Sequence, residues 1–444
     1  MKSSSVSPAR LAAFEILLRV EEGAYASVLL TAREDQLNNL DRGLCHELVM
    51  GVLRRQLWLD RLIEYYSDRK PSDLDIAIRV ILRLGLYQMR FLSRIPDSAA
   101  VNESVNLVKF ARLRSAGGLV NAVLRRATRE RDVDPASWIE NPIERISVNT
   151  SHPLWLIERW SKSLGSAEAE KFARANNESA PVAFRVVNTR AEESEVLEQL
   201  RLAGGNLSRS RVAHSAWRIT GAPGLLAQLA AIGQVYIQDE ASQLVPRVLN
   251  AKAGDRVLDL CAAPGGKTTQ IADSTLDSAT IVAADLHTHR LKTLVSTAKL
   301  HGLHNIQTVT LNALQPLPLT DSSFDRVLVD APCSGTGTLR RNPEIRWRIS
   351  PADIQDLSAR QKQLLQNAAS AVKSGGRLVY STCSIETDEN EAVREAFLEN
   401  NKPFRPVHLD IDSSLVTASG AARTWPQRDG TDGFFISVFE RNSD

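Results

Sequence analysis

The sequence contains few cysteines and no long apolar run. Only four cysteines occur in 444 residues, and none has the paired spacing of metal ligands, so no metal site is predicted. The chain also lacks a signal-peptide pattern and an apolar stretch long enough to cross a bilayer. These absences exclude a disulfide-stapled secreted domain and a transmembrane protein. They predict a cytoplasmic protein with reduced thiols.

Neither positive nor negative charge is in large excess. The 54 basic and 52 acidic side chains leave a formal net charge of +2. Such a balance neither requires nor excludes a nucleic-acid partner, so any basic patch must be local. The length allows two or three domains, each with a substantial core.

Residues 1–135 are predicted to form an all-α domain. Leu74, Ile78 and Leu82 repeat at helical spacing. Arginines lie between the apolar positions, and by itself this pattern fits an ordinary solvated helical bundle. Three stretches, however, resemble the antitermination factor NusB, a small helical RNA-binding protein: residues 95–96 (IP), 101–105 (VNESV) and 120–124 (VNAVL). The resemblance implies a NusB-like RNA-binding domain at this end of the chain.

Residues 145–237 are predicted to form a small α+β domain, after a linker marked by Pro135 and Pro142. Strand-like and helical segments alternate in this short stretch. The strands are expected at 182–187, 212–219 and 234–237, and the helices at 192–202 and 224–231. A simple spacer is the alternative interpretation. Residues 185–190 (RVVNTR), however, resemble a segment that commonly precedes RNA methyltransferase domains, which implies a linking and RNA-docking role.

Residues 238–444 are predicted to form an α/β domain of the Rossmann-like type. Strand-like segments separated by helical ones predict a doubly wound parallel sheet with helices on both faces. The five strands are expected at 257–260, 280–284, 306–309, 326–329 and 377–381, and a final strand at 433–439.

The motif DLCAAPGGKT, residues 259–268, follows the first of these strands and leads into a helix. Gly265 and Gly266 let the backbone approach a ligand closely, at the end of the strand where doubly wound folds bind nucleotides. The motif nearly matches a phosphate-binding P-loop, but Cys261 replaces the first glycine of that loop. A P-loop ATPase is a competing interpretation, because residues 327–330 (VLVD) fit the Asp-ended strand of such an enzyme.

Asp285 ends the second strand, 20 residues after Gly265 (285 − 265). An acidic residue at this place typically accepts hydrogen bonds from a ribose diol, which indicates an adenosine-bearing ligand. The full Gly-x-Gly-x-x-Gly turn of dinucleotide-binding proteins is absent. S-adenosylmethionine has no pyrophosphate to bind and therefore fits this turn better than a dinucleotide.

Two further strand ends carry cysteines, in the segments 330–333 (DAPC) and 382–384 (TCS). A lone cysteine is more often a buried hydrophobe than a nucleophile, but two at adjacent strand ends beside a cofactor turn indicate catalysis. Methylation of carbon 5 of a pyrimidine uses such a set. A thiolate adds to carbon 6, Asp330 receives the charge that develops at ring nitrogen 3, and a second thiol removes the proton from carbon 5.

With YSTCS at 380–384 and ENE at 389–391, these motifs resemble the Sun/Fmu family of RNA 5-methylcytosine methyltransferases. The resemblance implies that Cys383 is the nucleophile, that Cys333 aids release and that Asp330 activates the pyrimidine. It also implies cofactor contacts from Cys261, Ala262, Ala263, Pro264, Gly265, Gly266, Lys267, Thr268, Asp285, Asn312 and Asp330. Asn312 departs from the family, which usually has Asp at that place, so altered contacts to the adenine are expected.

The resemblance further implies the substrate, which would be a cytosine of 16S ribosomal RNA, the one usually numbered 967. We expect the chain to use S-adenosylmethionine and to act as a monomer on small-subunit RNA or an early assembly particle. The non-enzymatic alternative is a NusB-like RNA-binding adaptor with an idle α/β domain.

An arginine-rich segment follows Cys333. Guanidinium groups next to an aromatic ring hold single-stranded or looped RNA through phosphate contacts and stacking. We therefore predict RNA contacts from Arg340, Arg341, Arg346, Trp347 and Arg348, with a merely solvated loop as the alternative.

Overall fold

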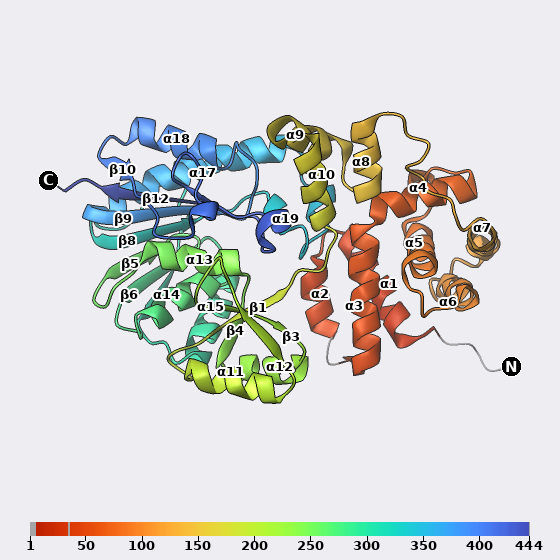
Figure 1. Ribbon diagram of the computed structural model, residues 1–444, viewed down its shortest axis with the longest axis horizontal. Coiled ribbons are helices and arrows are strands. Elements are labelled where there is room, and N and C mark those ends of the chain that lie inside the picture. The colour runs from red at the N-terminus through yellow and green to blue at the C-terminus, as the bar shows by residue number, and fades with distance from the viewer. Residues whose placement is uncertain (1–5, 34–35, 444) are drawn as a thin grey trace. The chain divides into compact units, whose positions relative to one another are not determined.

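The computed structural model describes residues 6–33 and 36–443. The chain divides into two compact units. The helical unit contains residues up to 179 together with 339–348, and the mixed unit contains residues 180–338 and 349 onward. Figure 1 labels the elements of both. Within the described residues, no helix combines the length and the apolar character needed to span a bilayer.

The helical unit confirms the all-α prediction for the first part of the chain. Its helices are α1 (Pro8–Glu21), α2 (Ala26–Arg33), α3 (Asn39–Arg54), α4 (Gln56–Ser67), α5 (Ile76–Phe91), α6 (Asp97–Phe110), α7 (Gly117–Arg129), α8 (Pro142–Thr150), α9 (Leu154–Leu164), α10 (Ser166–Ala175) and the short α16 (Ile345–Arg348). Helix α5 begins where the Asp75 side chain accepts a hydrogen bond from the Ala77 N–H (2.8 Å). Most of α5 is buried, so the apolar repeat seen in the sequence marks the core of this unit.

Some of the arginines between the apolar positions are structural. Arg83 on α5 is buried, and its guanidinium contacts both oxygens of Asp60 (2.7 and 2.8 Å) and one oxygen of Glu21 (2.5 Å). A buried charge is tolerated when it is paired in this way. The basic residues of the region are therefore not all available to an RNA.

The segment 339–348 belongs to the helical unit, although the mixed unit supplies the residues on either side of it along the chain. The Arg346 side chain is wholly buried there and donates to the Ser151 carbonyl (3.1 Å) and to Asn177 Oδ1 (2.9 Å). Burial, reinforced by the nearby charges of Arg54 and Arg55, lowers the pKa of Arg346 to about 9.

This burial corrects the predicted RNA-binding loop. An RNA phosphate cannot reach Arg346, and Arg340 is also buried, so the predicted contacts are wrong for these two residues. Arg348 is half-buried and already donates to the carbonyls of Val20, Gly23 and Ala24. RNA contacts from Arg341, Trp347 and Arg348 stay predictions.

The first sheet of the mixed unit is small and antiparallel, in the order β2-β3-β1-β4. Its elements are β1 (Val182–Val186), α11 (Glu193–Leu202), β2 (Asn206–Arg209), β3 (Ala216–Thr220), α12 (Pro223–Ala231) and β4 (Val235–Ile237). Phe184, Leu200 and Leu229 form part of its core. The α+β prediction is confirmed, and the edge strand β2 is added to it.

The second sheet has the order β10-β12-β9-β8-β5-β6-β7, with β11 paired to β12. Its elements are α13 (Glu240–Leu249), β5 (Arg256–Asp259), α14 (Gly266–Ser274), β6 (Thr280–Asp285), α15 (Thr288–Leu300), β7 (Ile306–Thr310), β8 (Phe324–Asp330), α17 (Pro351–Ala371), β9 (Val372–Thr382), α18 (Glu391–Asn400), β10 (Phe404–Pro406), β11 (Ala422–Arg423), α19 (Pro426–Asp429) and β12 (Phe435–Arg441). Strands β9, β8, β5, β6 and β7 pair in parallel, and β10, β11 and β12 pair antiparallel. All six predicted strands are present, which confirms the doubly wound α/β fold.

Helices cover both faces of this sheet. Alternate strand residues point to opposite faces, so Val257 packs with α13 and α14, whereas Leu258 packs with α17 and α18. Figure 1 shows the two helix layers on either side of the strands. The strand order reverses between β5 and β8, and ligands of doubly wound folds bind at such a switch point. The division predicted at residues 135, 145 and 237 stays a prediction.

The burial of Arg346 predicts a large effect on stability. Arg346→Ala should lower the free energy of unfolding by about 2–4 kcal/mol, because a cavity forms and buried acceptors lose their donors. The measurement is chemical denaturation followed by circular dichroism. Arg360→Ala is the control, because Arg360 makes only a surface pair with Asp356 and its loss should cost under about 0.5 kcal/mol. Equal unfolding midpoints for the two variants would contradict the structural role of Arg346.

Candidate active site

The ends of β8 and β9 hold the predicted catalytic residues side by side. The two strands pair in parallel with Asp330 opposite Ser381. The Ser381 hydroxyl donates to Asp330 Oδ1 at 2.7 Å, which fixes one oxygen of the carboxylate. The polypeptide leaves each strand directly afterwards, in the loops that carry Cys333 and Cys383.

The two loops bring the cysteines together. The Sγ atoms of Cys333 and Cys383 lie 3.3 Å apart, and both residues are half-buried free thiols. The contact with Cys383 and then burial raise the pKa of Cys333 well above that of an ordinary thiol. Two thiols so close do not ionise together readily, so ionisation of one holds the proton on the other. The pair can therefore present one thiolate and one thiol.

A buried carboxylate holds both cysteine loops. Glu389 accepts hydrogen bonds from the Ser334 N–H and from Gln361 Nε2, both at 2.9 Å. It also accepts from the hydroxyls of Ser334 and Ser384, both at 2.5 Å. Because these serines directly follow the two cysteines, one carboxylate fixes the spacing of the thiols. The sequence contains Glu389 within the ENE motif, but its function as a support becomes visible only in the structure.

A close contact between Gly337 and Gly433 brings the segment before β12 next to the cysteine loops. The Gly337 N–H donates to the Cys383 carbonyl at 2.9 Å, and the Gly433 N–H donates to the Gly337 carbonyl at 2.8 Å. A Cβ atom on Gly337 would lie 1.9 Å from the Gly433 carbonyl oxygen, so this approach requires glycine.

Lys267 connects the cofactor motif to the catalytic carboxylate. Its Nζ lies 2.6 Å from Asp330 Oδ2 and 5.2 Å from the centre of the Phe434 ring. Burial favours the neutral amine, but the charge of Asp330 and the hydrogen bond to it outweigh burial and raise the pKa of Lys267. The sequence predicts Lys267 as a cofactor contact, but the motif does not reveal its pairing with Asp330.

The turn from β5 into α14 has the conformation that its glycines allow. Gly265 has φ = 107°, and a Cβ there would lie 2.6 Å from Leu294 Cγ. The Thr268 hydroxyl donates to Asp259 Oδ2 at 2.7 Å, which ties the start of α14 to the end of β5. At the end of β6, Asp285 accepts from the N–H groups of Ala263 (3.2 Å) and His287 (2.9 Å).

A cavity of about 180 Å³ opens at this turn. Its lining includes the predicted residues Cys261, Ala262, Ala263, Pro264, Gly265, Gly266, Lys267 and Asp330, together with Tyr236, Ile237, Gln238, Ser242 and Asp259, which the motif did not reveal. Thr268 and Asp285 are not part of this lining, but they form hydrogen bonds with residues that are: Thr268 with Asp259, and Asp285 with Ala263. Asn312 lies exposed after β7, where its side chain accepts from the Leu314 N–H (3.1 Å), and its predicted adenine contact stays a prediction.

The cavity suits a cationic, adenosine-bearing cofactor. Asp259 Oδ1 and Gln238 Oε1 are buried acceptors that have no hydrogen-bond partner within the described part of the chain. Burial raises the pKa of Asp259 to about 7, although the hydrogen bond from Thr268 opposes the shift. A positively charged ligand with N–H or O–H donors would satisfy both acceptors, and S-adenosylmethionine has these properties.

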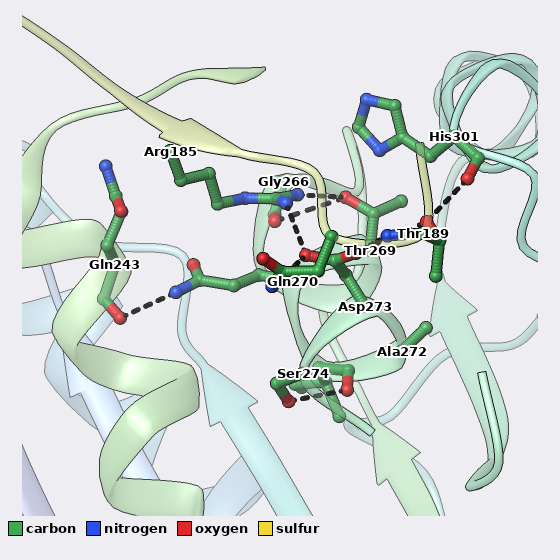
Figure 2. Close-up of polar contacts among 12 residues, drawn as sticks. Arg185, Thr189, Gln243, Gly266, Thr269, Gln270, Ala272, Asp273, Ser274 and His301 are labelled. Atoms are coloured by element: carbon green, nitrogen blue, oxygen red, sulfur yellow. Dashed lines mark hydrogen bonds and ion pairs between the residues drawn. The ribbon is translucent and has the colours of Figure 1, made fainter. Parts of the chain in front are cut away.

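The small sheet also supports the cofactor turn. Figure 2 shows Arg185 of β1 reaching α14, where its guanidinium contacts Thr269 Oγ1 (3.2 Å) and Asp273 Oδ2 (3.4 Å). The same guanidinium lies over the ring of Tyr236 (5.1 Å), which in turn packs against Gly266. Burial lowers the pKa of Arg185 to about 10. The α+β region therefore contributes directly to the wall of the cavity, which sequence spacing does not reveal.

Three family models match the chain, each in a different region. The NusB family model matches residues 7–129. The ferredoxin-like domain model of the RsmF/B-like methyltransferases matches residues 152–224, and the 16S rRNA methyltransferase RsmB/F model matches residues 246–440.

Relatives are similar over nearly the whole chain. The probable ribosomal RNA small subunit methyltransferase B of Bacillus subtilis is 36% identical, over 98% of this chain and 98% of its own. The ribosomal RNA small subunit methyltransferase B of Pseudomonas putida is 34% identical, over 96% and 97%. The crystal structure of PH0851 superposes with a TM-score of 0.85 at 29% identity, over 98% of this chain and 99% of that one.

The fold, the glycine turn and these matches define a class I methyltransferase that depends on S-adenosylmethionine. The chain belongs to the RsmB/F family of 16S rRNA methyltransferases, with a NusB-type N-terminal region. This assignment removes the P-loop ATPase and the non-catalytic adaptor as interpretations.

The raised pKa of Asp259 predicts a pH-dependent cofactor affinity. A cationic ligand binds the carboxylate form better, and this attraction is lost as the pH falls through about 7. The dissociation constant of S-adenosylmethionine, measured by titration calorimetry, should therefore be roughly tenfold higher at pH 6 than at pH 8. Asp259→Asn keeps the acceptor for Thr268 and should bind with little pH dependence. An affinity of the unaltered protein that stays constant over this range would contradict the prediction.

Proposed function

We propose that this enzyme methylates carbon 5 of a cytosine in 16S ribosomal RNA, cytosine 967, through a covalent bond between Cys383 and carbon 6 of the base. The observation that carries the proposal is the pair of Sγ atoms 3.3 Å apart beside Asp330. Every residue of the proposed chemistry lies within one chain, which supports action as a monomer. Ribosomal RNA as substrate supports a cytoplasmic location.

The cavity at the glycine turn is the proposed cofactor site. S-adenosylmethionine bound there would supply an electrophilic methyl group. Gly265 and Gly266 would permit its close approach, Asp285 would accept from the ribose, and Asp259 would lie near the cationic part. Because the base must leave its stack to reach half-buried thiols, the RNA is expected to present a looped or flipped nucleotide.

The first proposed step is addition of the Cys383 thiolate to carbon 6 of the cytosine. A carbon–sulfur bond forms at carbon 6, and the π electrons of the 5,6 double bond become delocalised over carbon 5 and ring nitrogen 3, which makes carbon 5 nucleophilic. In this step Asp330 would hydrogen-bond ring nitrogen 3. The proton shared between Lys267 and Asp330 can neutralise the charge that develops there.

The last step is release of the enzyme after carbon 5 has taken the methyl group. The proton on carbon 5 must leave, and the carbon–sulfur bond must break to restore the double bond. The contact with Cys383 is the largest cause of the raised Cys333 pKa. Once the Cys383 sulfur is bonded to carbon 6, that cause is removed, and Cys333 can ionise and act as the base.

Replacing the nucleophile tests the first step. Cys383→Ala should abolish incorporation of methyl groups into 16S rRNA, a loss of at least a thousandfold, because carbon 5 is then never activated. Mass spectrometry of digested RNA measures 5-methylcytosine at the target site. Cys45→Ala, which changes a buried cysteine of the helical unit, is the control and should remain active. Methylation by folded Cys383→Ala protein would remove Cys383 as the nucleophile.

Replacing the second thiol tests the release step. Cys333→Ala should stop turnover after methylation, so that an RNA–protein adduct accumulates and migrates as one species on a denaturing gel. The double variant Cys333→Ala/Cys383→Ala should form no adduct. If the single variant binds RNA and cofactor but traps no RNA, the division of labour between the two cysteines is wrong.

A further inference from the structure

A second cleft of the mixed unit lies outside the site described above. It has a volume of about 760 Å³ and is lined by β2, the turn after it, α19 and residues 412–415. Four arginines and three serine hydroxyls contribute to its walls: Arg209, Arg211, Arg218, Arg428, Ser208, Ser210 and Ser414. We call it the arginine cleft.

The carboxylates of the arginine cleft do not cancel its charge. Only Asp412 and Asp429 line it, against four arginines. Asp429 already accepts from Arg428 (2.8 Å) and from the Trp425 N–H (2.7 Å). Asp412 accepts from the Ser414 N–H (2.9 Å), and this bond, together with the charges of Arg211 and Arg428, lowers the pKa of Asp412. Glu193 and Glu240, outside the lining, also pair with Arg209 and Arg218. Neither Asp412 nor Asp429 forms a hydrogen bond with Arg209 or Arg211 in the described part of the chain.

Two of the arginines are placed for an external ligand. Arg218 is fixed by Glu240 and by the Asp429 carbonyl, so its function is structural. Arg209 is exposed, lies over the Trp217 ring (5.4 Å) and donates one bond to the His214 carbonyl. It also makes an ion pair with Glu193 (3.6 Å), and such an exposed pair is weak enough for a phosphate to replace it. Arg211 is exposed and forms no hydrogen bond or ion pair within the described part of the chain.

The arginine cleft begins close to the catalytic loops. Gly430 lines the cleft, and three residues later Gly433 donates to Gly337, which itself donates to the Cys383 carbonyl. Three residues of extended chain span at most about 11 Å. The edge of the cleft at Gly430 therefore lies close to the segment that contacts the catalytic loops.

We propose that the arginine cleft binds the sugar–phosphate backbone of the RNA strand next to the target cytosine. Guanidinium groups donate to phosphate oxygens, and serine hydroxyls bond to phosphate or ribose oxygens. The cleft thereby takes the role that the buried Arg340 and Arg346 cannot perform. The proposal rests on the proposed function, because it places the target base at Cys383.

Charge removal in the arginine cleft tests this proposal. The double variant Arg209→Gln/Arg211→Gln removes two positive charges and keeps a polar, unbranched side chain at both positions. Fluorescence anisotropy with a labelled, cytosine-containing single-stranded RNA should show roughly tenfold weaker binding at low salt. The plot of log affinity against log salt should become shallower by about 1.4, from two contacts at about 0.7 each. In turnover assays KM for RNA should rise, while kcat and the affinity for S-adenosylmethionine stay unchanged.

Two controls make the test specific. Arg201→Gln and Arg405→Gln remove exposed arginines that do not line the cleft, and both should keep the salt dependence of the unaltered enzyme. Ser414→Glu adds a negative charge inside the cleft and should weaken RNA binding without removing any arginine. Thermal unfolding of each variant checks that the fold is kept.

An unchanged salt dependence in the double variant, together with unchanged binding by Ser414→Glu, would overturn the proposal. The result is separable from the proposed function. If the unaltered protein binds RNA but forms no 5-methylcytosine, the proposed function fails, and the salt dependence of binding still decides whether the cleft holds phosphates.

Discussion

The parallel pairing of β8 with β9 is the constraint on which the site depends. Because Asp330 lies opposite Ser381, the loops that leave the two strands start at the same level of the sheet. A shift of one residue would turn Asp330 toward the other face and separate the thiols. Glu389 then fixes the loops themselves, since its two oxygens bind the residues that follow each cysteine. Strand register sets the coarse geometry, and one buried carboxylate sets the fine spacing.

An ion pair connects the cofactor cavity to the strand ends that carry the cysteine loops. Lys267 comes from the glycine turn and pairs with Asp330, so one ion pair connects the lining of the cavity to the strand end that leads to Cys333. Asp259 lies at the end of the adjacent strand β5 and prefers its proton when no cation is near. The buried carboxylate of Asp259 therefore favours a positively charged group beside it in the cavity.

The parts of the fold and site that depend on local signals could be predicted from the sequence. Apolar runs predicted all six strands around the site, and the strand-end positions of Cys333 and Cys383 predicted their meeting. The parts that depend on residues far apart in the sequence could not be predicted. Strand β2 (Asn206–Arg209) lies at a sheet edge and has little apolar pattern to reveal it. The charge of Arg346 indicates a surface residue, because nothing nearby in the sequence shows that the turns after α8 and α10 supply buried acceptors for it. Tyr236 and Gln238 are distant from the glycine motif in sequence.

Residues 339–348 belong to the helical unit, although the segments on both sides of them belong to the mixed unit. The helical unit is therefore not one continuous stretch of the chain. The polypeptide passes between the two units three times, at 179/180, 338/339 and 348/349. A single cut at any one of these crossings still leaves the two units linked through the other two crossings. A gene fragment encoding only the first 179 residues would lack α16, and the complementary fragment would carry Arg346 without its acceptors. Recombination that exchanges the helical unit as one contiguous block is therefore disfavoured, and the two units are expected to be inherited together.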